Sequence, residues 1–296
     1  MKRSVILLLS LIGLLMLSGC GKKQPAGDTV EPLSVKQVTS LLYRNSETTL
    51  RFTCDKDKWT WVDGEGFPLD DSTIKEILAR LSEIASAEPE SKGTDLSACG
   101  LAEPTRFLTV GSDEGERTIY FGTQAANGMW YMRPAESDKV YLISDEFVQL
   151  LEKNIYDMTV LPALPELTEE NMTFIGVTKS EENYTYLLHA DGTWKYNGKD
   201  VAATAKRILK ELDGMTLTRC VDYFPAAGVS ELCGLTEGAT TVTLKYLNSV
   251  GSESELVLTV GTLMESGEGY YLTMGDSDAV YCLPQHQLNT LLSLLE

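Results

Sequence analysis

The chain has 296 residues, a length that fits about two domains, and its hydrophobic content of 43% is enough for each domain to bury a core. The formal net charge is −18, so the surface repels nucleic acid and anionic lipid headgroups, and we exclude nucleic acid as a partner. Two interpretations of the charge stay open. It keeps an exported protein soluble, or an acidic face recruits cations or a basic partner.

The first 20 residues have the pattern of a lipoprotein signal peptide. Lys2 and Arg3 form a basic start, and residues 5–17 are an apolar run, shorter than the roughly 20 residues that a membrane-spanning helix needs. Residues 17–20 (Leu-Ser-Gly-Cys) resemble the lipobox of bacterial lipoproteins, in which the thiol of Cys20 is acylated and becomes the mature N-terminus. Several acyl chains would anchor the chain stably. The alternative is an ordinary signal peptide with a chance cysteine.

Residues 21–33 carry no hydrophobic periodicity and several breakers of regular structure, so we expect a flexible tether. A first folded unit then begins. Residues 34–62 predict three strands, because apolar and polar residues alternate along them. A helix follows, since apolar residues recur at intervals of three and four positions, at Ile74, Ile77, Leu78, Leu81 and Ile84.

Four more strands are predicted after Pro104, because short apolar runs alternate with turns rich in Gly, Pro and Asp. A second helix, with Ser144 at its start, closes this first unit, which we assign to residues 34–157. Residues 158–166 contain two prolines and are predicted to be a semi-rigid linker. The second unit is assigned to residues 167–296. It is predicted to contain a helix that begins after Asp200, and Asp200 is the predicted capping residue.

The second unit repeats the order of features of the first. Residues 99–101 (Cys-Gly-Leu) return at residues 233–235, with a Thr-Trp pair upstream and a Val-Tyr strand downstream of each copy. The distance between the copies grows only from 133 residues at the upstream Trp to 140 residues at the downstream Tyr. So small a drift indicates short insertions in turns. We therefore predict an α+β fold of two tandem repeats, each an antiparallel sheet with helices packed on one side.

Five cysteines remain besides Cys20, namely Cys54, Cys99, Cys220, Cys233 and Cys282. An odd number argues against a complete disulfide framework, and no Cys-x-x-Cys pair supports a zinc or thioredoxin-like site. We interpret Cys99 and Cys233 as buried thiols at matching turns. A disulfide or a catalytic thiolate stays open, although a thiolate needs a His or a helix N-terminus beside it, and His189 and His286 lie in unlike contexts.

The sequence contains none of the common catalytic or nucleotide-binding motifs, such as Gly-x-Ser-x-Gly, Gly-x-x-x-x-Gly-Lys-Ser/Thr or His-Glu-x-x-His. Acidic loops at residues 55–57, 63–65, 113–114 and 276–278 lack the ligand offsets of a calcium site, and hairpin turns need the same residue types. We therefore expect no catalytic residues, no metal site and no cofactor.

Seven aromatic residues occupy matching positions in the two units: Trp59, Trp61, Trp130, Tyr131, Trp194, Tyr270 and Tyr271. Shared position is what core packing predicts, so we assign these side chains to the cores. The alternative is a platform on which carbohydrate or peptide stacks.

One order of features resembles a known family: a Trp-containing turn, an amphipathic helix, Gly-Leu followed by Pro, a strand ending in Gly, and a Val-Tyr strand. Here these features lie at residues 59–62, 74–84 and 100–104, at Gly122 and at residues 140–142. The order resembles domain of unknown function 4340 over about residues 34–157. The second unit is a weaker copy, with Gly238 where the first has Pro104. The resemblance implies a bacterial exported protein or lipoprotein, in some members beside ABC-transporter components, and carries over no catalytic residues.

These observations predict a non-enzymatic binding or scaffold module of unknown ligand. We expect it to be anchored through a lipid on Cys20 to the extracytoplasmic face of the cell membrane, with an envelope partner such as an ABC transporter. The alternative is a small-ligand-binding protein or a hydrolase with a site between the two repeats. A concave cleft with converging polar side chains at the junction would favour this alternative, and a filled junction would favour the scaffold.

Overall fold

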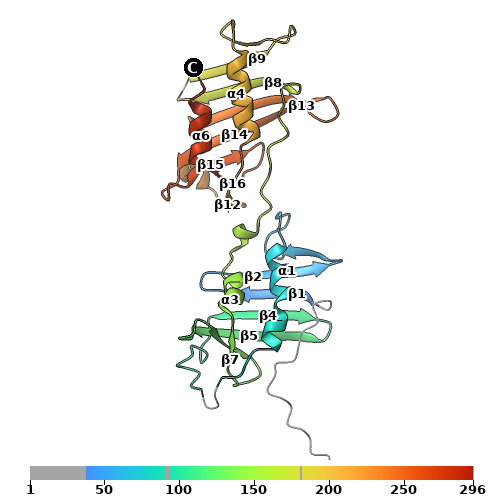
Figure 1. The fold of residues 1–296 in the computed structure, drawn as a ribbon, viewed down its shortest axis with the longest axis vertical. Coiled ribbons are helices and arrows are strands. Elements are labelled where there is room, and N and C mark those ends of the chain that lie inside the picture. The colour runs from blue at the N-terminus through green and yellow to red at the C-terminus, as the bar shows by residue number, and fades with distance from the viewer. Residues whose placement is uncertain (1–37, 91–93, 181, 296) are drawn as a thin grey trace, which may run out of the picture.

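The computed structural model describes residues 38–90, 94–180 and 182–295. It contains two antiparallel sheets and few helices, and Figure 1 shows one sheet toward each end of the molecule, with a connecting segment between them. The predicted signal peptide, Cys20 and the predicted tether lie outside the described residues. Within the described ranges, no helix combines the length and the apolar character needed to span a membrane.

The first sheet has seven strands in the order β3-β2-β1-β4-β5-β6-β7. Their bounds are β1 (Val38–Arg44), β2 (Thr49–Asp55), β3 (Lys58–Trp61), β4 (Arg106–Ser112), β5 (Gly115–Gln124), β6 (Trp130–Pro134) and β7 (Tyr141–Ile143). The helical segments are α1 (Ser72–Ala79), α2 (Leu81–Ala85), α3 (Asp145–Leu151) and the 3₁₀ turn η2 (Ile155–Met158). The turn η2 ends the first unit and leads into the linker.

The second sheet has nine strands in the order β11-β10-β9-β8-β13-β14-β15-β16-β12. Their bounds are β8 (Met172–Lys179), β9 (Glu182–Leu188), β10 (Trp194–Tyr196), β11 (Lys199–Asp200), β12 (Arg219–Asp222), β13 (Thr240–Leu247), β14 (Glu253–Leu263), β15 (Gly269–Met274) and β16 (Val280–Pro284). The helices are α4 (Ala202–Asp213), α5 (Val229–Leu232) and α6 (Gln285–Leu292).

The two sheets share one strand order. Strands β3-β2-β1-β4-β5-β6-β7 of the first correspond to β10-β9-β8-β13-β14-β15-β16 of the second, and β11 and β12 are added at its two edges. The sequence did not predict β12. This strand of four residues pairs with β16 at the edge of the sheet, and so brings residues 219–222 to the side of the unit that meets η2.

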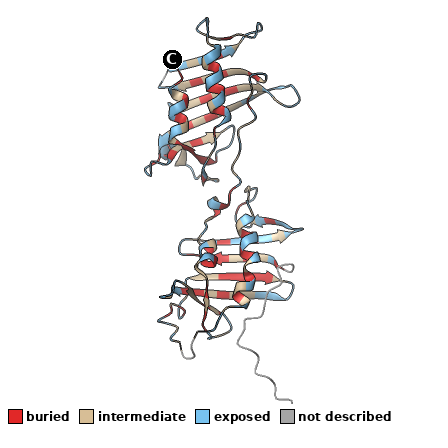
Figure 2. Ribbon diagram, in the orientation of Figure 1, coloured by how far each residue is buried: buried red, intermediate tan, exposed pale blue. Residues whose placement is uncertain are grey.

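Alternating burial along the strands builds each core. On β13, Val242 and Leu244 are buried while the neighbouring Thr241 and Thr243 are only half-buried, and Figure 2 shows such buried positions along the central strands. The buried residues of α4 and α6 join the same apolar cluster as these strands, and the two helices contact each other. The first unit has its own cluster, to which α1 contributes residues such as Ile77.

The helix ends follow the expected capping chemistry only in part. Ser144 caps α3 as predicted, because its hydroxyl accepts a hydrogen bond of 3.3 Å from the backbone N–H of Phe147. The prediction for Asp200 was wrong in position: Val201 is the capping residue of α4, and the Asp200 carboxylate accepts from the first helical N–H, that of Ala202, at 3.0 Å. Asp200 instead belongs to the short strand β11, where it pairs with Lys195 of β10, so the helix begins one residue later than predicted.

Candidate functional site

The repeated Cys-Gly-Leu segments form the same turn in both units. In the first unit, the backbone N–H of Thr123 donates a hydrogen bond of 2.8 Å to the carbonyl oxygen of Cys99. In the second, the N–H of Thr262 donates to the carbonyl oxygen of Cys233 at 2.9 Å. Each bond ties the turn to the residue that follows the strand glycine, on β5 or β14, so the turn is held against the sheet. Both strands run two residues beyond this glycine, where the sequence analysis expected them to end.

A glycine on that strand makes each contact achievable. A Cβ atom added to Gly122 would overlap the carbonyl oxygen of Cys99, and one added to Gly261 would overlap that of Cys233. Because the obstacle is backbone, no side-chain movement could relieve it. The strand glycine and the Cys-Gly-Leu turn therefore form one structural motif, which occurs once in each unit.

The turn cysteines are packing groups. The exposed fraction is 4% for Cys99 and 6% for Cys233, and Cys99 belongs to a small apolar cluster with Leu101 and Val140. Burial, the largest cause, raises the pKa of both thiols, so each stays protonated and poorly nucleophilic at neutral pH. This agrees with the interpretation of both residues as buried thiols.

All five cysteines of the described part are free thiols. Cys220 and Cys282 lie on the paired strands β12 and β16, but Cys220 stands opposite Tyr281 and Cys282 opposite Arg219. The two thiols therefore point to opposite faces of the sheet and cannot bridge. Burial raises the pKa of Cys220 to about 11, which makes it a poor nucleophile as well.

Five aromatic residues meet where the two units adjoin, four of them half-buried and Phe224 exposed: Trp61, Phe67, Tyr156, Tyr223 and Phe224. We call them the junction cluster. Phe67 is central, and its ring centroid lies 5.2 Å from those of Trp61 and Tyr223, edge to face in both cases. It also lies 6.4 Å from Tyr156 and 6.5 Å from Phe224. Since Trp61 and Phe67 belong to the first unit and Tyr223 and Phe224 follow β12, the cluster joins the two units.

The loop after β3 is shaped around Trp61. A Cβ atom on Gly64 would overlap the indole ring, so the backbone of this loop approaches the ring more closely than any other residue type would permit. The indole Nε1 atom is buried and has no hydrogen-bond partner among the described residues. Trp61 therefore contributes apolar contact to the junction and no polar anchoring.

A hydrogen bond crosses the junction beside the cluster. The hydroxyl of Tyr156, on η2, donates to the carboxylate of Asp222 at the end of β12, with an O···O distance of 2.8 Å. The same carboxylate accepts from the backbone N–H of Phe224 at 3.1 Å, which orients it. Burial, and then the bond to Asp222, raise the pKa of Tyr156 to about 12, so the hydroxyl stays protonated and able to donate.

A cleft of about 340 Å³ also lies at the junction, lined by residues 47–48, 154–157 and 219–221. Its main polar groups are already engaged. The Asp157 carboxylate accepts from the backbone N–H of Asn154 at 3.0 Å and completes a capping box, while Arg219 forms an ion pair of 3.1 Å with Glu268. These groups therefore stabilise the fold around the cleft.

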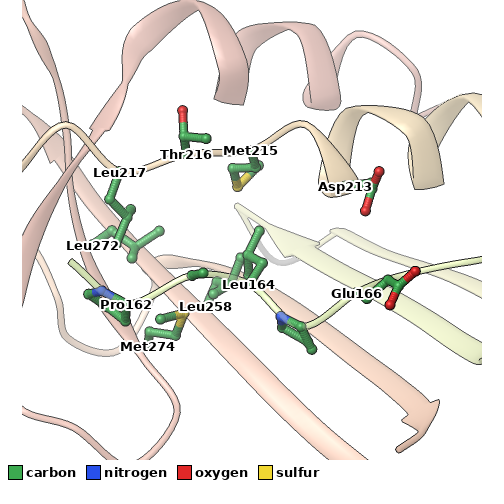
Figure 3. A pocket seen from close by; sticks show the side chains of 12 residues that line it. Pro162, Leu164, Glu166, Asp213, Met215, Thr216, Leu217, Leu258, Leu272 and Met274 are labelled. Atoms are coloured by element: carbon green, nitrogen blue, oxygen red, sulfur yellow. The ribbon is translucent and has the colours of Figure 1, made fainter. Parts of the chain in front are cut away.

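A separate, largely apolar pocket of about 430 Å³ lies beside the linker. Residues 162–166 of the linker form one wall, and the loop after α4 forms another. Six Leu and Met side chains line it, namely Leu164, Met215, Leu217, Leu258, Leu272 and Met274. Figure 3 shows the carboxylates of Glu166 and Asp213 at one end of this pocket and Pro162 near the other. We call this cavity the linker pocket.

The structure does not bring the remaining candidate residues together into a reactive site. His189 is exposed in the turn after β9, and His286 is exposed on α6. Among the described residues, no group of three or more His, Cys, Asp or Glu side chains is placed to hold a metal ion. The four acidic loops named above therefore form no such metal-binding group in the described ranges.

The aromatic residues assigned to the cores divide into two groups. Trp59 and Trp194 are each 6% exposed and belong to the cores of their units, as predicted. Trp130 is half-buried, and its indole N–H donates to Asp145 at 2.7 Å. Trp61 is half-buried at the junction. Tyr131, Tyr270 and Tyr271 are likewise half-buried. A contiguous stacking platform would need exposed rings, and none of the seven is classed as exposed.

Sequence reasoning missed Phe67, Tyr156, Tyr223 and Phe224. Their only signal is that these aromatic residues stand outside the strands and helices predicted for the repeat, in the Gly-rich loop after β3, on η2 and after β12. Apolar residues that lie at the ends of elements and do not recur in the other unit therefore indicate contacts between units.

A family model described as domain of unknown function 4340 matches residues 59–236. The match covers more than half of the chain and runs from β3 into the second unit, beyond the range of residues 34–157 expected from the sequence. All five residues of the junction cluster lie inside it. No curated protein and no solved structure matches the chain. The chain belongs to the family of domain of unknown function 4340.

Proposed function

We propose that this protein is a non-enzymatic, lipid-anchored module that holds two sheets as one body at the extracytoplasmic face of the cell membrane. Its partner is an envelope complex such as an ABC transporter. The observation that carries the proposal is the set of aromatic contacts and the hydrogen bond that cross the junction, next to the cleft described above. The junction cluster and the bond between Tyr156 and Asp222 link two units that a tether-like connection would leave independent.

Several aromatic contacts and one hydrogen bond cross the junction, although Phe224 is 48% exposed. Aromatic pairs at these separations contribute about 0.5–1.5 kcal/mol each beyond the area they bury, and the cluster contains several. The linker itself is docked, since the N–H of Val160 donates to the carbonyl of Pro68 at 2.7 Å. A module of fixed geometry suits a protein that presents one surface to a partner.

In each unit we propose that the helices cover one side of the sheet and that the other side is available to the partner. In the second unit, a row of threonines in register supports this: Thr178, Thr241, Thr259 and Thr273 stand opposite one another across four strands. They alternate with the buried residues that contact α4 and α6. A flat row of small, uncharged side chains on an acidic protein favours protein contact over contact with anionic lipid.

Labelling cells with a radioactive fatty acid tests the anchor. The proposal predicts label on the full chain and none on Cys20→Ser, which should leave the membrane fraction. Cys54→Ser is the matched control and should keep both label and location. A full chain that carries no label would remove the anchor from the proposal.

Chemical crosslinking in membranes tests the partner. The full chain should capture a transporter or other envelope component, and Cys20→Ser should capture much less of it because it is no longer held at the membrane. If the full chain captures no envelope protein under several crosslinking conditions, the scaffold role is wrong.

The second candidate is a small-ligand-binding protein. The linker pocket favours it, since about 430 Å³ lies within the usual size range of ligand sites. This pocket is formed by the linker and the second unit, and so differs from the site between the repeats that the sequence analysis considered. The hydrolase half of that alternative gains no support, because the polar groups of the junction cleft are engaged in the fold.

A further inference from the structure

We infer that the linker pocket binds a small molecule with an aliphatic body and a single cationic ammonium end. The inference concerns a different part of the chain from the junction and does not depend on the anchor or on an envelope partner. It follows from the lining of the pocket, the chemistry of its wall and the charge at its end.

The floor of the pocket is made by side chains of the second core. Leu258 and Leu272 are each 1% exposed and Met215 is 6% exposed, so most of the apolar surface open to a ligand comes from the half-buried Leu164, Leu217 and Met274. Apolar surface removed from water contributes about 25 cal/mol per Å². The two methionines of the pocket, Met215 and Met274, are flexible and adapt to ligands of different shape. The body of the ligand is therefore apolar.

The linker wall offers few hydrogen-bond donors. Pro162 and Pro165 have no backbone N–H, and Ala163 and Leu164 between them have apolar side chains. A carboxylate or phosphate ligand needs N–H donors or cationic side chains around it. Among the residues that the structure describes, no Lys or Arg lines the pocket. Anionic ligands such as fatty acids are thus disfavoured along its whole length.

Two carboxylates define one end of the pocket. Glu166 comes from the linker and Asp213 from the last residue of α4, so they stand on different walls of one cavity (Figure 3). Both are exposed, and neither side chain has a hydrogen-bond or ion-pair partner within the described part of the chain. Ionised carboxylates only accept hydrogen bonds, so the complementary group is a cationic donor. An ammonium group at this end of the pocket would meet these carboxylates while its alkyl chain lies against Leu217 and Met274.

A matched series of eight-carbon probes tests the inference: octylamine, octanol and octanoate, added to the full chain with its methionine methyl groups labelled with ¹³C. Octylamine should shift the signals of Met215 and Met274, assigned from Met215→Leu and Met274→Leu, and should leave the core residue Met132 unmoved. Octanol should bind about fivefold more weakly and octanoate more weakly still. Equal binding of the three probes, or unmoved Met215 and Met274 signals, would overturn the inference.

Charge-neutral variants locate the cationic end. Glu166→Gln combined with Asp213→Asn should bring octylamine binding down to the level of octanol, while octanol binding stays unchanged because the apolar walls are intact. Glu170→Gln combined with Glu237→Gln removes the same charge from exposed positions outside the pocket and should leave the preference for octylamine in place. If both double variants weaken octylamine binding equally, only the net charge matters and the assigned site is wrong.

Discussion

The hydroxyl of Tyr156 donates a hydrogen bond of 2.8 Å to the carboxylate of Asp222, and this bond joins the last turn of the first unit to the edge strand β12 of the second. It lies beside the junction cluster, to which Tyr156 itself belongs. A polar bond with fixed geometry thus accompanies a non-directional apolar contact. Both interactions link the two units.

Tyr156→Phe should lower the free energy of unfolding by about 1 kcal/mol, since it removes a hydrogen bond to a charged acceptor at a partly solvated site. Urea denaturation followed by tryptophan fluorescence measures the change. Tyr184→Phe is the matched control, because the Tyr184 hydroxyl bonds the exposed Glu182 within β9 at 2.8 Å and away from the junction. Equal effects of the two variants would argue against a special role of the junction bond.

The contribution of Tyr156 should depend on pH at the alkaline end. Its pKa is raised from 10 to about 12 by burial and then by the bond to Asp222, so the folded state holds this proton more tightly than the unfolded state. Its stabilisation is therefore complete below pH 10 and is lost as the pH rises through 12. The stability difference between the parent and Tyr156→Phe should shrink over this window. A difference that stays constant or grows would contradict the assignment.

Gly122→Ala and Gly261→Ala should each destabilise their own unit by about 1–3 kcal/mol, because the new methyl group meets a backbone carbonyl that cannot move away. Gly214→Ala is the control. The Cβ atom there would lie 3.4 Å from the nearest backbone oxygen, and the residue has an ordinary φ of −81°. Thermal unfolding gives the comparison. If the two strand variants behave like the control, the repeated turn is not held as described.

Alkylation should distinguish Cys54 from the other cysteines of the described part. Cys54 is half-buried, whereas Cys99, Cys220, Cys233 and Cys282 are between 0% and 6% exposed. Iodoacetamide at pH 8 should modify Cys54 first and the remaining four only after denaturation, as read by mass spectrometry of peptides. Fast modification of Cys99 or Cys233 in the native protein would show that the turns are open.

The repeat could be read from the sequence because its determinants are local. The Cys-Gly-Leu turn contains one glycine and packs against a second glycine on the neighbouring strand, and both are visible in the sequence. The alternating strands and the cap at Ser144 are visible there too. Residue types that specify a turn lie within a few positions of one another, so a pattern reveals them. The two antiparallel sheets follow from these local units.

The junction could not be read in the same way. Strand β12 has only four residues and little alternation, and it exists because β16 offers an edge to pair with. Phe67 and Tyr223 meet only after both units have folded, so no spacing in the sequence encodes their contact. The linker pocket was missed for the same reason. Its walls come from the linker, from the end of α4 with the loop after it, and from the β14–β15 hairpin, and these three segments are far apart in the chain.

The distance between the two units tests the central claim most directly. Spin labels at Glu114→Cys and Val250→Cys, both at exposed positions and introduced with Cys54→Ser, report this distance by pulsed electron resonance on the full chain. The account predicts one narrow distribution that broadens when Tyr156→Phe and Phe67→Ala are added. A broad distribution without these two changes would show that the units move independently, and would contradict a module held as one body.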